Sequence, residues 1–443
     1  MRLLVLTPEF AAWGGGIATF YRNSLKHLQA MGVSIRVIEG SATSNSETVD
    51  RKTIDGVATE KLELKRFTRW HERFSHLSAA PTLRRHLAAS CALWEQAVEG
   101  PRFDVVEATD WGLLFLAPVS AGTHPTIVQG HGSCGQISAY DPIPGDETSD
   151  LIVRLVELAF LARASDVQTY SERNATDWRA ELQRNIRMIR PGWIAAPQPQ
   201  PALPMSGRGL VVGRVQSWKG PDTLCEALRI LGPDAPQLDW VGREVPWGRQ
   251  GLGGGAYLRN TYPDIWGRLV THHAPLAPAS IAAKQAGAAF NLIPSAWDVF
   301  NFTAAEALAS GRPTIVSSGA GASELIEDGR NGFVFPAGNP GALARAIERS
   351  LALTPIEQNE MATNALRTLE TTLAPDRIAA QRYEAYQSAI TTHAASPASL
   401  PSWLAKICSP PEEKAGEDNF LENHPLRMLV GHAARRLVRK VTS

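Results

Sequence analysis

Cysteine is scarce in this chain of 443 residues, and the four that occur are widely scattered, at Cys91, Cys134, Cys225 and Cys408. No pair stands at the spacing of metal ligands, so the sequence predicts neither a zinc site nor a disulfide framework, and a reduced intracellular protein is the simplest interpretation. An excess of one charge is absent as well, because 44 basic and 44 acidic side chains cancel. The overall field therefore gives no argument for a nucleic-acid partner.

Long apolar runs are also lacking. The N-terminal sequence MRLLVLTPEF has one arginine and a short apolar run that ends at Pro8, which is too short for a signal peptide and predicts a first strand. The most apolar helical segment, Leu151–Ala164, is interrupted by three charged residues, whereas a membrane span needs about 20 apolar residues. We therefore expect a cytoplasmic protein that is soluble or bound peripherally at the inner face of the membrane.

Two short motifs are missing that would point to particular ligands. The glycines at 14–16 do not spell the dinucleotide fingerprint, which disfavours a nicotinamide cofactor. No Asp-any-Asp triplet occurs in the chain, so a bound divalent metal is not predicted either. We expect neither a cofactor nor a metal.

The sequence does contain a regular alternation of short apolar runs and helical segments, which predicts an α/β fold with parallel sheets. Runs typical of strands in the first half are Arg2–Thr7, Ser34–Ile38, Asp104–Ala108, Thr126–Gln129 and Asp166–Tyr170. Those in the second half include Gly209–Val212, Leu238–Val241 and Ala288–Ile293. A proline-rich connector at residues 195–204 separates the halves and is the predicted domain boundary.

The most informative stretch is Pro294–Pro313, which follows a buried strand and includes a predicted helix at Thr303–Ser310. A loop that ends at a helix N-terminus presents free backbone N–H groups, and the helix dipole favours an anion there, so this stretch predicts a phosphate site. Asp298 in the loop and Glu306 in the helix are separated by seven residues. One carboxylate can then reach the far end of a ligand while the other accepts hydrogen bonds from hydroxyls near its middle, which points to a long, hydroxyl-rich ligand.

A second loop of this kind lies at Gly213–Gly220, between a strand and a helix that begins at Pro221, where the missing N–H of proline costs nothing. Arg214 and Lys219 are five residues apart in this loop, so both can converge on a diphosphate at the end of the strand. From the residues alone, two solvated surface cations would be the ordinary alternative.

Candidate residues also follow the strands of the first half, where parallel sheets hold their ligands. Gly14-Gly15-Gly16, after the first strand, predicts either a turn that lets the backbone approach a ligand or a plain structural turn. His131, flanked by glycines after the fourth strand, is either a proton-handling or sugar-contacting side chain or a bystander. Asp110, after the third strand, is a candidate helix N-cap.

The two loops of the second half resemble the two signatures of the retaining glycosyltransferases of family 4. These are the acid, seven residues, acid pattern of Asp298 and Glu306, followed by Gly311-Arg312-Pro313, and the Gly-Arg to Lys-Gly pattern of Gly213–Gly220. The resemblance covers about residues 1–390, weakly in the first half and specifically in the second. One departure is that the family usually has Glu where this chain has Asp298.

The resemblance implies a GT-B architecture, in which two Rossmann-like domains face each other across a cleft. It also implies transfer of a sugar, with retention, from a nucleotide diphosphate sugar to an acceptor hydroxyl on a glycan, a glycolipid or a small glycoside. By this resemblance Arg214 and Lys219 stabilise the leaving diphosphate, and Glu306 accepts the ribose hydroxyls. Asp298 holds the sugar hydroxyls and His131 lies over the sugar from the other domain. Further donor contacts are implied at Gly15, Gly16, Gly213, Phe300, Asn301, Phe302 and Thr303, and Asp110 falls on the acceptor side.

The predicted domains are an acceptor domain at 1–194, the connector at 195–204 and a donor domain at 205–375. A helix at 376–395 is expected to cross back to the first domain, as in the family, and a tail follows at 396–443. Within the tail, 426–441 predicts a basic amphipathic helix that lies on an anionic membrane or docks on the protein itself. A GT-B glycan phosphorylase, a non-catalytic sugar-nucleotide binding protein and a nucleotide-sugar epimerase stay open as alternatives.

Overall fold

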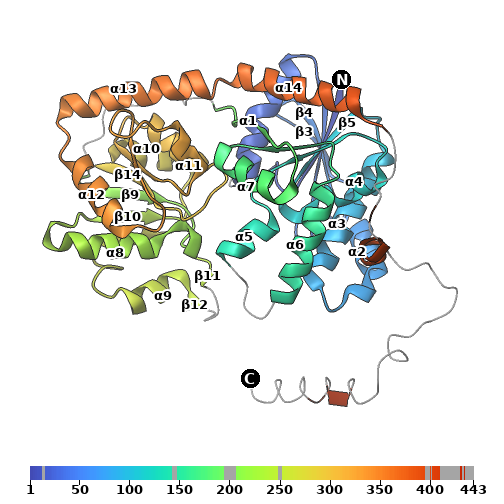
Figure 1. Cartoon of the computed structure of the whole chain (residues 1–443), viewed down its shortest axis with the longest axis horizontal. Helices are drawn as coiled ribbons and strands as arrows, with labels where there is room; N and C mark the ends of the chain where they lie inside the picture. Colours follow the sequence, from blue (N-terminus) through green and yellow to red (C-terminus); the bar gives the residue numbers. More distant parts are fainter. Residues whose placement is uncertain are drawn as a thin grey trace.

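The computed structural model describes residues 1–11, 15–141, 147–193, 206–247, 252–394, 400, 402–409, 430–431 and 434 (Figure 1). Within these ranges the chain forms two α/β domains, each built on one parallel sheet. The predicted connector at 195–204 and most of the predicted basic helix at 426–441 lie outside the described residues. The predicted α/β fold with two Rossmann-like domains is confirmed.

The N-terminal domain contains an eight-stranded sheet in the order β3-β4-β2-β1-β5-β6-β7-β8, parallel except for β3. Its strands are β1 Arg2–Thr7, β2 Ser34–Glu39, β3 Arg51–Ile54, β4 Val57–Lys61, β5 Val105–Thr109, β6 Thr126–Gln129, β7 Asp166–Thr169 and β8 Arg187–Met188. Its helices are α1 Gly16–Ala30, α2 Leu64–Arg73, α3 Pro81–Val98, α4 Leu116–Ala121, α5 Cys134–Tyr140, α6 Glu147–Leu161 and α7 Glu172–Leu182. The central strands are buried apolar runs because helices cover both faces.

The C-terminal domain contains a six-stranded parallel sheet in the order β13-β10-β9-β14-β15-β16. Its strands are β9 Gly209–Val212, β10 Leu238–Val241, β13 Val270–His273, β14 Phe290–Ile293, β15 Thr314–Ser317 and β16 Phe333–Phe335. Its helices are α8 Pro221–Leu231, α9 Gly254–Thr261, α10 Pro278–Gly287, α11 Phe302–Ala309, α12 Pro340–Leu351 and α13 Pro355–Thr372. A short antiparallel pair, β11 Pro246–Trp247 and β12 Leu252–Gly253, lies outside this sheet.

The last long helix, α14 (Pro375–Thr392), leaves the C-terminal domain and packs on α1, β5 and β6 of the N-terminal domain. Figure 1 shows α13 and α14 running along one edge of both domains. Arg382 of α14 is buried, and it pairs with Glu107 of β5 at 2.7 Å and donates to the Gln129 side chain of β6 at 3.0 Å. The C-terminal helix is therefore anchored inside the first domain by a buried ion pair.

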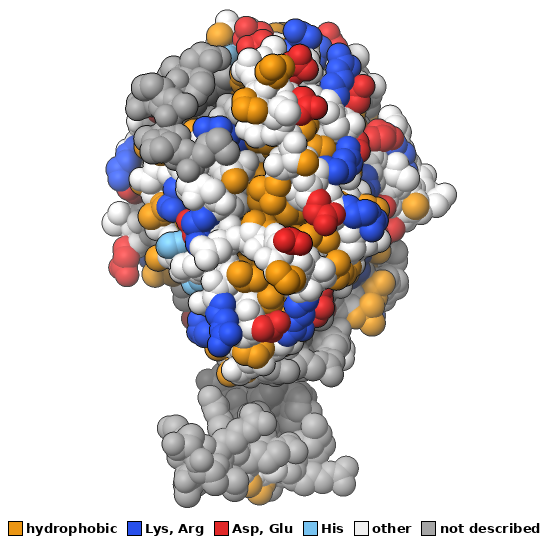
Figure 2. Space-filling view, turned by 90° about the vertical axis from the view of Figure 1, so that its left-hand side faces the viewer, with side chains coloured by type: hydrophobic (Ala, Val, Ile, Leu, Met, Phe, Trp, Pro, Cys, Tyr) orange, Lys and Arg blue, Asp and Glu red, His pale blue; other side chains and the backbone are white. Residues whose placement is uncertain are grey.

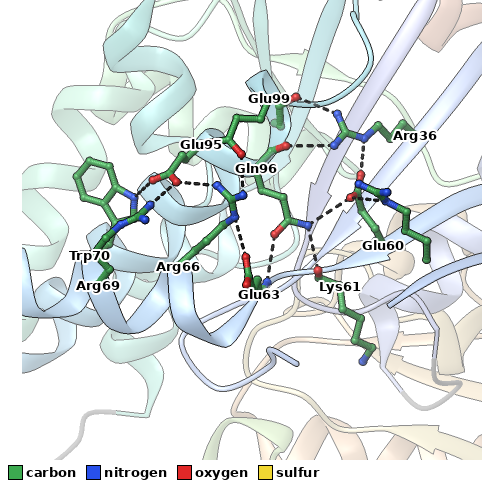
Figure 3. A network of polar contacts seen from close by, with 12 residues as sticks. Arg36, Glu60, Lys61, Glu63, Arg66, Arg69, Trp70, Glu95, Gln96 and Glu99 are labelled. Atoms are coloured by element: carbon green, nitrogen blue, oxygen red, sulfur yellow. Dashed lines mark hydrogen bonds and ion pairs between the residues drawn. The ribbon is translucent and has the colours of Figure 1, made fainter. Parts of the chain in front are cut away.

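A second polar network joins β2 and β4 to α2 and α3 at the edge of the N-terminal domain (Figure 3). Glu95 of α3 is its centre, because its carboxylate accepts from Arg66 at 2.6 Å, from Arg69 and from the Trp70 indole at 2.6 Å. Arg66 also reaches Glu99 at 2.6 Å. Arg66 and Arg69 of α2 are thus neutralised by α3, and this network holds α2 against the domain.

The outer side of the C-terminal domain is drawn in Figure 2. Basic and acidic side chains alternate over it, with apolar side chains between them. The exposed apolar residues of α8, α12 and α13 include Ile230, Leu351 and Ile356. The face shown therefore mixes both charges, in keeping with the balanced composition.

Candidate active site

The candidate site lies at the ends of β9, β14 and β15 in the second sheet. The loops that follow these three strands are joined by backbone hydrogen bonds. The Ala296 N–H donates to the Trp218 carbonyl at 2.8 Å, which joins the loop after β14 to the loop after β9. The Asp298 N–H donates to the Gly319 carbonyl at 2.9 Å, which joins it to the loop after β15. Asp298 is thereby fixed at the carboxyl edge of a parallel sheet, where such sheets bind ligands.

Asn301 turns the chain from this loop into α11. Its backbone is left-handed, with φ of 82°, a conformation that asparagine tolerates better than most residues. Its side chain accepts from the Ala304 N–H at 3.2 Å as the helix N-cap and donates to Asp298 Oδ2 at 2.8 Å. The helix starts at Phe302, one residue before the predicted start at Thr303, because Asn301 is the cap.

The two predicted cations lie beside the same tryptophan. Lys219 Nζ is 4.4 Å and the Arg214 guanidinium 5.9 Å from the ring centroid of Trp218. Lys219 Nζ also donates to Asp298 Oδ2 at 2.5 Å. Burial and the neighbouring charge of Arg243 lower the pKa of Arg214, and the charge of Asp298 acts in the opposite direction. The structure thus brings Arg214, Lys219 and Asp298 together.

Gly213 and Gly220 frame the loop that carries both cations. Gly220 has a φ of 77°, and a Cβ on it would lie 2.0 Å from the Pro294 carbonyl oxygen. Only glycine lets this loop approach the end of β14 so closely. Gly213 has open space around it, and its carbonyl accepts from the Trp240 indole at 2.9 Å.

The second acid of the predicted motif, Glu306, lies in α11, and burial raises its pKa to about 7. Thr303 is half-buried in the first turn of the same helix, and its carbonyl accepts from Gln285 at 3.5 Å. Phe300 and Phe302 pack on each other and on Tyr170 of the other domain. Because the Phe300 side chain is buried, a ligand can meet this residue only through its backbone.

The glycine loop of the N-terminal domain faces α11. Gly15 is the N-cap of α1 and Gly16 is its first residue, while Gly14 lies outside the described residues. A Cβ on Gly16 would lie 3.7 Å from the Phe302 ring, so the N-termini of α1 and α11 meet across the boundary between the domains. Both helix dipoles place their positive ends at this boundary, and at α1 the Glu9 carboxylate lies against Gly15.

His131 sits at the end of β6, packed edge-on against Phe20, with ring centroids 5.2 Å apart. Its Nδ1 lies 2.9 Å from the Tyr170 hydroxyl. Burial, followed by the charge of Arg382, lowers the pKa of His131 to about 3. The imidazole is therefore neutral at physiological pH, and Tyr170 sets its orientation.

Asp110 is a buried N-cap, which is the structural interpretation that the sequence offered. Its carboxylate accepts from the backbone N–H groups of Trp111 at 2.7 Å, His131 at 2.8 Å and Gly132 at 3.2 Å. Burial raises its pKa to about 7, and these hydrogen bonds oppose the increase. Asp110 thus holds the His131 loop in place, while its contact with an acceptor stays a prediction.

Several residues that connect the two domains beside the site were not predicted from the sequence. Trp297, next to Asp298, stacks on Tyr140 of α5 with ring centroids 5.2 Å apart. Asp141 accepts from Gln216 at 2.5 Å and from Ser217 at 2.9 Å, so the first domain also holds the loop that carries Arg214 and Lys219. The sequence signal for these contacts was an aromatic residue, Trp297, directly before Asp298.

Glu324 of the C-terminal domain binds the N-terminus of α7 in the N-terminal domain. Its carboxylate accepts from the Glu172 and Arg173 N–H groups, at 3.0 and 2.9 Å, and lies 3.4 Å from Arg190. A carboxylate at the N-terminus of α7 is stabilised by the helix dipole. Glu324 therefore has a structural role, because it joins the C-terminal domain to α7.

Within the described ranges, no group of three or more His, Cys, Asp or Glu side chains could hold a metal ion. In the same part of the chain, no helix is long and apolar enough to cross a bilayer.

Comparisons with known proteins agree with this geometry. The family model "Glycosyl transferase 4-like domain" matches residues 15–192, and "Glycosyl transferases group 1" matches residues 207–352. A D-inositol 3-phosphate glycosyltransferase of Streptomyces avermitilis is 29% identical over 189 residues, 42% of this chain and 40% of that protein. One of Paenarthrobacter aurescens is 30% identical over 143 residues, 31% of this chain and 34% of that protein. The chain spans about two fifths of the length of the first of these curated relatives.

Solved structures show the same fold over most of the chain. Sucrose-phosphate synthase from Thermosynechococcus elongatus aligns with a TM-score of 0.68 at 20% identity, covering 88% of this chain and 100% of that one. HepE of Anabaena in complex with UDP-glucose aligns with a TM-score of 0.63 at 18% identity, with the same coverage. Because the two family models together match well over half of the residues and the fold agrees, this chain belongs to the family 4 type of GT-B glycosyltransferases.

Proposed function

We propose that the protein is a retaining glycosyltransferase that moves a sugar from a nucleotide diphosphate sugar to an acceptor hydroxyl. The observation that carries the proposal is the meeting of Lys219, Arg214 and Asp298 beside the N-terminus of α11, opposite the N-terminus of α1. Cations and helix N-termini suit a diphosphate, and carboxylates suit the hydroxyls of a sugar. The HepE structure with UDP-glucose supports a donor of this class.

In the proposed reaction, the bond between the anomeric carbon and the diphosphate oxygen breaks, and the electron pair leaves with the diphosphate. Arg214, Lys219 and the α11 N-terminus stabilise this charge, which grows in the transition state, so they act on the barrier more than on ground-state binding. The acceptor oxygen bonds to the same face of the anomeric carbon, and its proton passes to the departing phosphate. The products are a glycoside of retained configuration and a nucleoside diphosphate.

The remaining roles are proposed from the resemblance to the family. Glu306 accepts hydrogen bonds from the ribose hydroxyls, and Asp298 exchanges its Lys219 contact for hydroxyls of the donor sugar. His131, neutral and oriented by Tyr170, offers a hydrogen bond to the sugar from the opposite domain. Positive charge at the leaving group comes from side chains, so we propose a metal-independent reaction. Undiminished turnover in excess EDTA is expected, and loss of turnover restored by Mg²⁺ would contradict this part.

The experiment combines a donor panel with product analysis. Melting shifts with UDP, GDP, ADP and dTDP identify the base, and release of that diphosphate from the matching sugar donor measures turnover. NMR of the product reports the anomeric configuration. Dependence on inorganic phosphate instead of a nucleotide would indicate a phosphorylase, binding without turnover a sugar-nucleotide binding protein, and conversion without acceptor an epimerase.

The proposed cellular place is the cytoplasm, with peripheral contact at the inner face of the membrane through 426–441. The support is the spacing of basic and apolar residues in that segment. Sedimentation with anionic liposomes tests it: the full chain is expected to bind and a chain ending at residue 425 to remain free. Equal binding by both chains would remove the membrane role of this segment.

A further inference from the structure

Glu9 is a carboxylate beside the N-terminus of α1 to which neither motif gives a role. It follows β1, and its side chain lies directly on the backbone of Gly15, where a Cβ would be only 1.7 Å from Glu9 Oε2. A hydrogen bond from the Ala18 N–H, in the first turn of α1, reaches the same carboxylate. Glu9 thus supplies the negative charge that the N-terminus of α1 favours.

The cations of the other domain face this carboxylate. Burial raises the pKa of Glu9, and the charges of Arg214 and Arg243 act against that increase. The charge of Glu9 in turn acts on Arg214, which belongs to the loop proposed to hold the diphosphate. Glu9 of the N-terminal domain is therefore within electrostatic reach of Arg214 and Arg243 in the C-terminal domain.

Two cations of the N-terminal domain near this loop are engaged by carboxylates. Lys61 pairs with Glu39 at 3.1 Å, and Arg22 pairs with Asp55 at 2.7 Å. The second oxygen of Glu39 accepts from the Ala11 N–H at 2.8 Å. An anionic group that entered beside α1 would therefore meet the Glu9 charge, while Arg214 of the other domain belongs to the loop proposed to hold the diphosphate.

We propose that Glu9 is a specificity-determining residue that selects an uncharged, hydroxyl-rich acceptor and excludes a phosphorylated one. The inference rests on the proposed function and names the acceptor class of the same site. A carboxylate accepts hydrogen bonds from hydroxyls, which favours a neutral sugar or polyol. A phosphate ester would bring like charge against Glu9 and compete with it for the α1 N-terminus.

The test uses matched acceptor pairs that differ only by a phosphoryl group: inositol and inositol 3-phosphate, glucose and glucose 6-phosphate, fructose and fructose 6-phosphate. Acceptor-dependent diphosphate release from the preferred donor gives kcat/KM for each member. Wild-type protein is expected to favour the neutral member of its best pair by roughly tenfold or more. Glu9→Gln keeps the shape and removes the charge, and it is expected to reduce this ratio by about the same factor. Glu360→Gln, an exposed glutamate on α13, is the control for loss of one negative charge.

Other results would overturn the inference. These are a wild-type preference for the phosphorylated members, an unchanged ratio in Glu9→Gln, or no use of any neutral member while the donor is still hydrolysed. Tighter diphosphate binding in Glu9→Gln with an unchanged ratio would place Glu9 against the donor instead. Failure of the proposed function is distinct, because then no sugar nucleotide would be bound or consumed by the wild-type protein. If Glu9→Gln fails to fold, a wild-type preference for the phosphorylated members would still overturn the inference.

Discussion

Lys219 Nζ lies 2.5 Å from Asp298 Oδ2, so the cation of one signature loop neutralises the acid of the other before any ligand binds. The pair joins the loops after β9 and β14, and both side chains are largely buried, with exposures of 16% and 15%. A bound donor offers each side chain a better partner, because the diphosphate suits the ammonium group and the sugar hydroxyls suit the carboxylate. We infer that the pair keeps both groups in place for the proposed donor.

Replacing Lys219 with Ala is expected to reduce kcat by about 10²–10³-fold, because it removes a charge that acts mainly on the leaving group in the transition state. Diphosphate release from the donor measures the effect, and thermal unfolding checks that the variant is folded. Lys26→Ala, at an exposed position of α1, is the matched control and should keep wild-type turnover. Turnover of Lys219→Ala within a factor of about three of wild type would remove Lys219 from the reaction.

Asn301 makes a separate prediction about stability. Asn301→Ala loses the helix cap and places an alanine at positive φ, so we expect a loss of about 1–3 kcal/mol in the free energy of unfolding. Asn301→Gly also loses the cap but is free of the conformational cost, so its loss should be only a few tenths of a kcal/mol. Urea unfolding of the two variants measures the difference. Equal losses would mean that the left-handed backbone does not contribute.

Much of this site could be predicted from sequence because its motifs are contiguous. Arg214 and Lys219 follow one buried strand within a few residues, and Asp298 and Glu306 follow another, so the parallel sheet brings both motifs to one edge. The predicted strands Arg2–Thr7 and Gly209–Val212 match the structure residue for residue, since apolar runs bounded by polar residues define buried parallel strands.

The contacts between the domains could not be predicted in the same way. Asp141 meets Gln216 across 75 residues of sequence, and Trp297 meets Tyr140 in the other domain. Such pairs depend on how two sheets are placed, which no local pattern encodes. Asn301 left a weaker signal in the sequence, because asparagine is common both at N-caps and in left-handed backbone.

Glu306 predicts how stability depends on pH. Burial raises its folded-state pKa from an ordinary value of 4.5 to about 7, so between these values the folded state holds a proton that the unfolded state has lost. The contribution of Glu306 to the free energy of unfolding is therefore greatest below pH 4.5. It falls as the pH rises to about 7 and is constant above that. Glu306→Gln cannot titrate. Its stability relative to wild type should thus rise by roughly 1–3 kcal/mol between pH 4.5 and pH 8.

Urea unfolding of both proteins across this pH range measures the difference, in which contributions from other groups cancel. Glu360→Gln again serves as the control, since its exposed carboxylate should give a constant difference from wild type. Parallel stability profiles of wild type and Glu306→Gln would show that the Glu306 carboxyl has an ordinary pKa in the folded protein.

The last prediction concerns the buried anchor of α14. Arg382→Met removes the partner of Glu107 and leaves its carboxylate uncompensated in the interior, so a loss of about 3–5 kcal/mol is expected. The double variant Arg382→Met with Glu107→Gln removes both charges and should lose clearly less, because the cost lies in the unpaired charge. Urea unfolding of the two variants, with Glu107→Gln alone to complete the cycle, measures the coupling.

The same variants test whether Arg382 only anchors α14 or also influences His131 in the candidate site. Arg382 lies over the Phe20 ring at 4.6 Å, and Phe20 packs edge-on against His131. Since the charge of Arg382 helps to lower the pKa of His131, removing it should raise that pKa, and NMR titration of the imidazole would record the change. A double variant as unstable as Arg382→Met would contradict the unpaired-charge argument. An unchanged His131 titration in the folded double variant would instead limit Arg382 to holding α14 on the first domain.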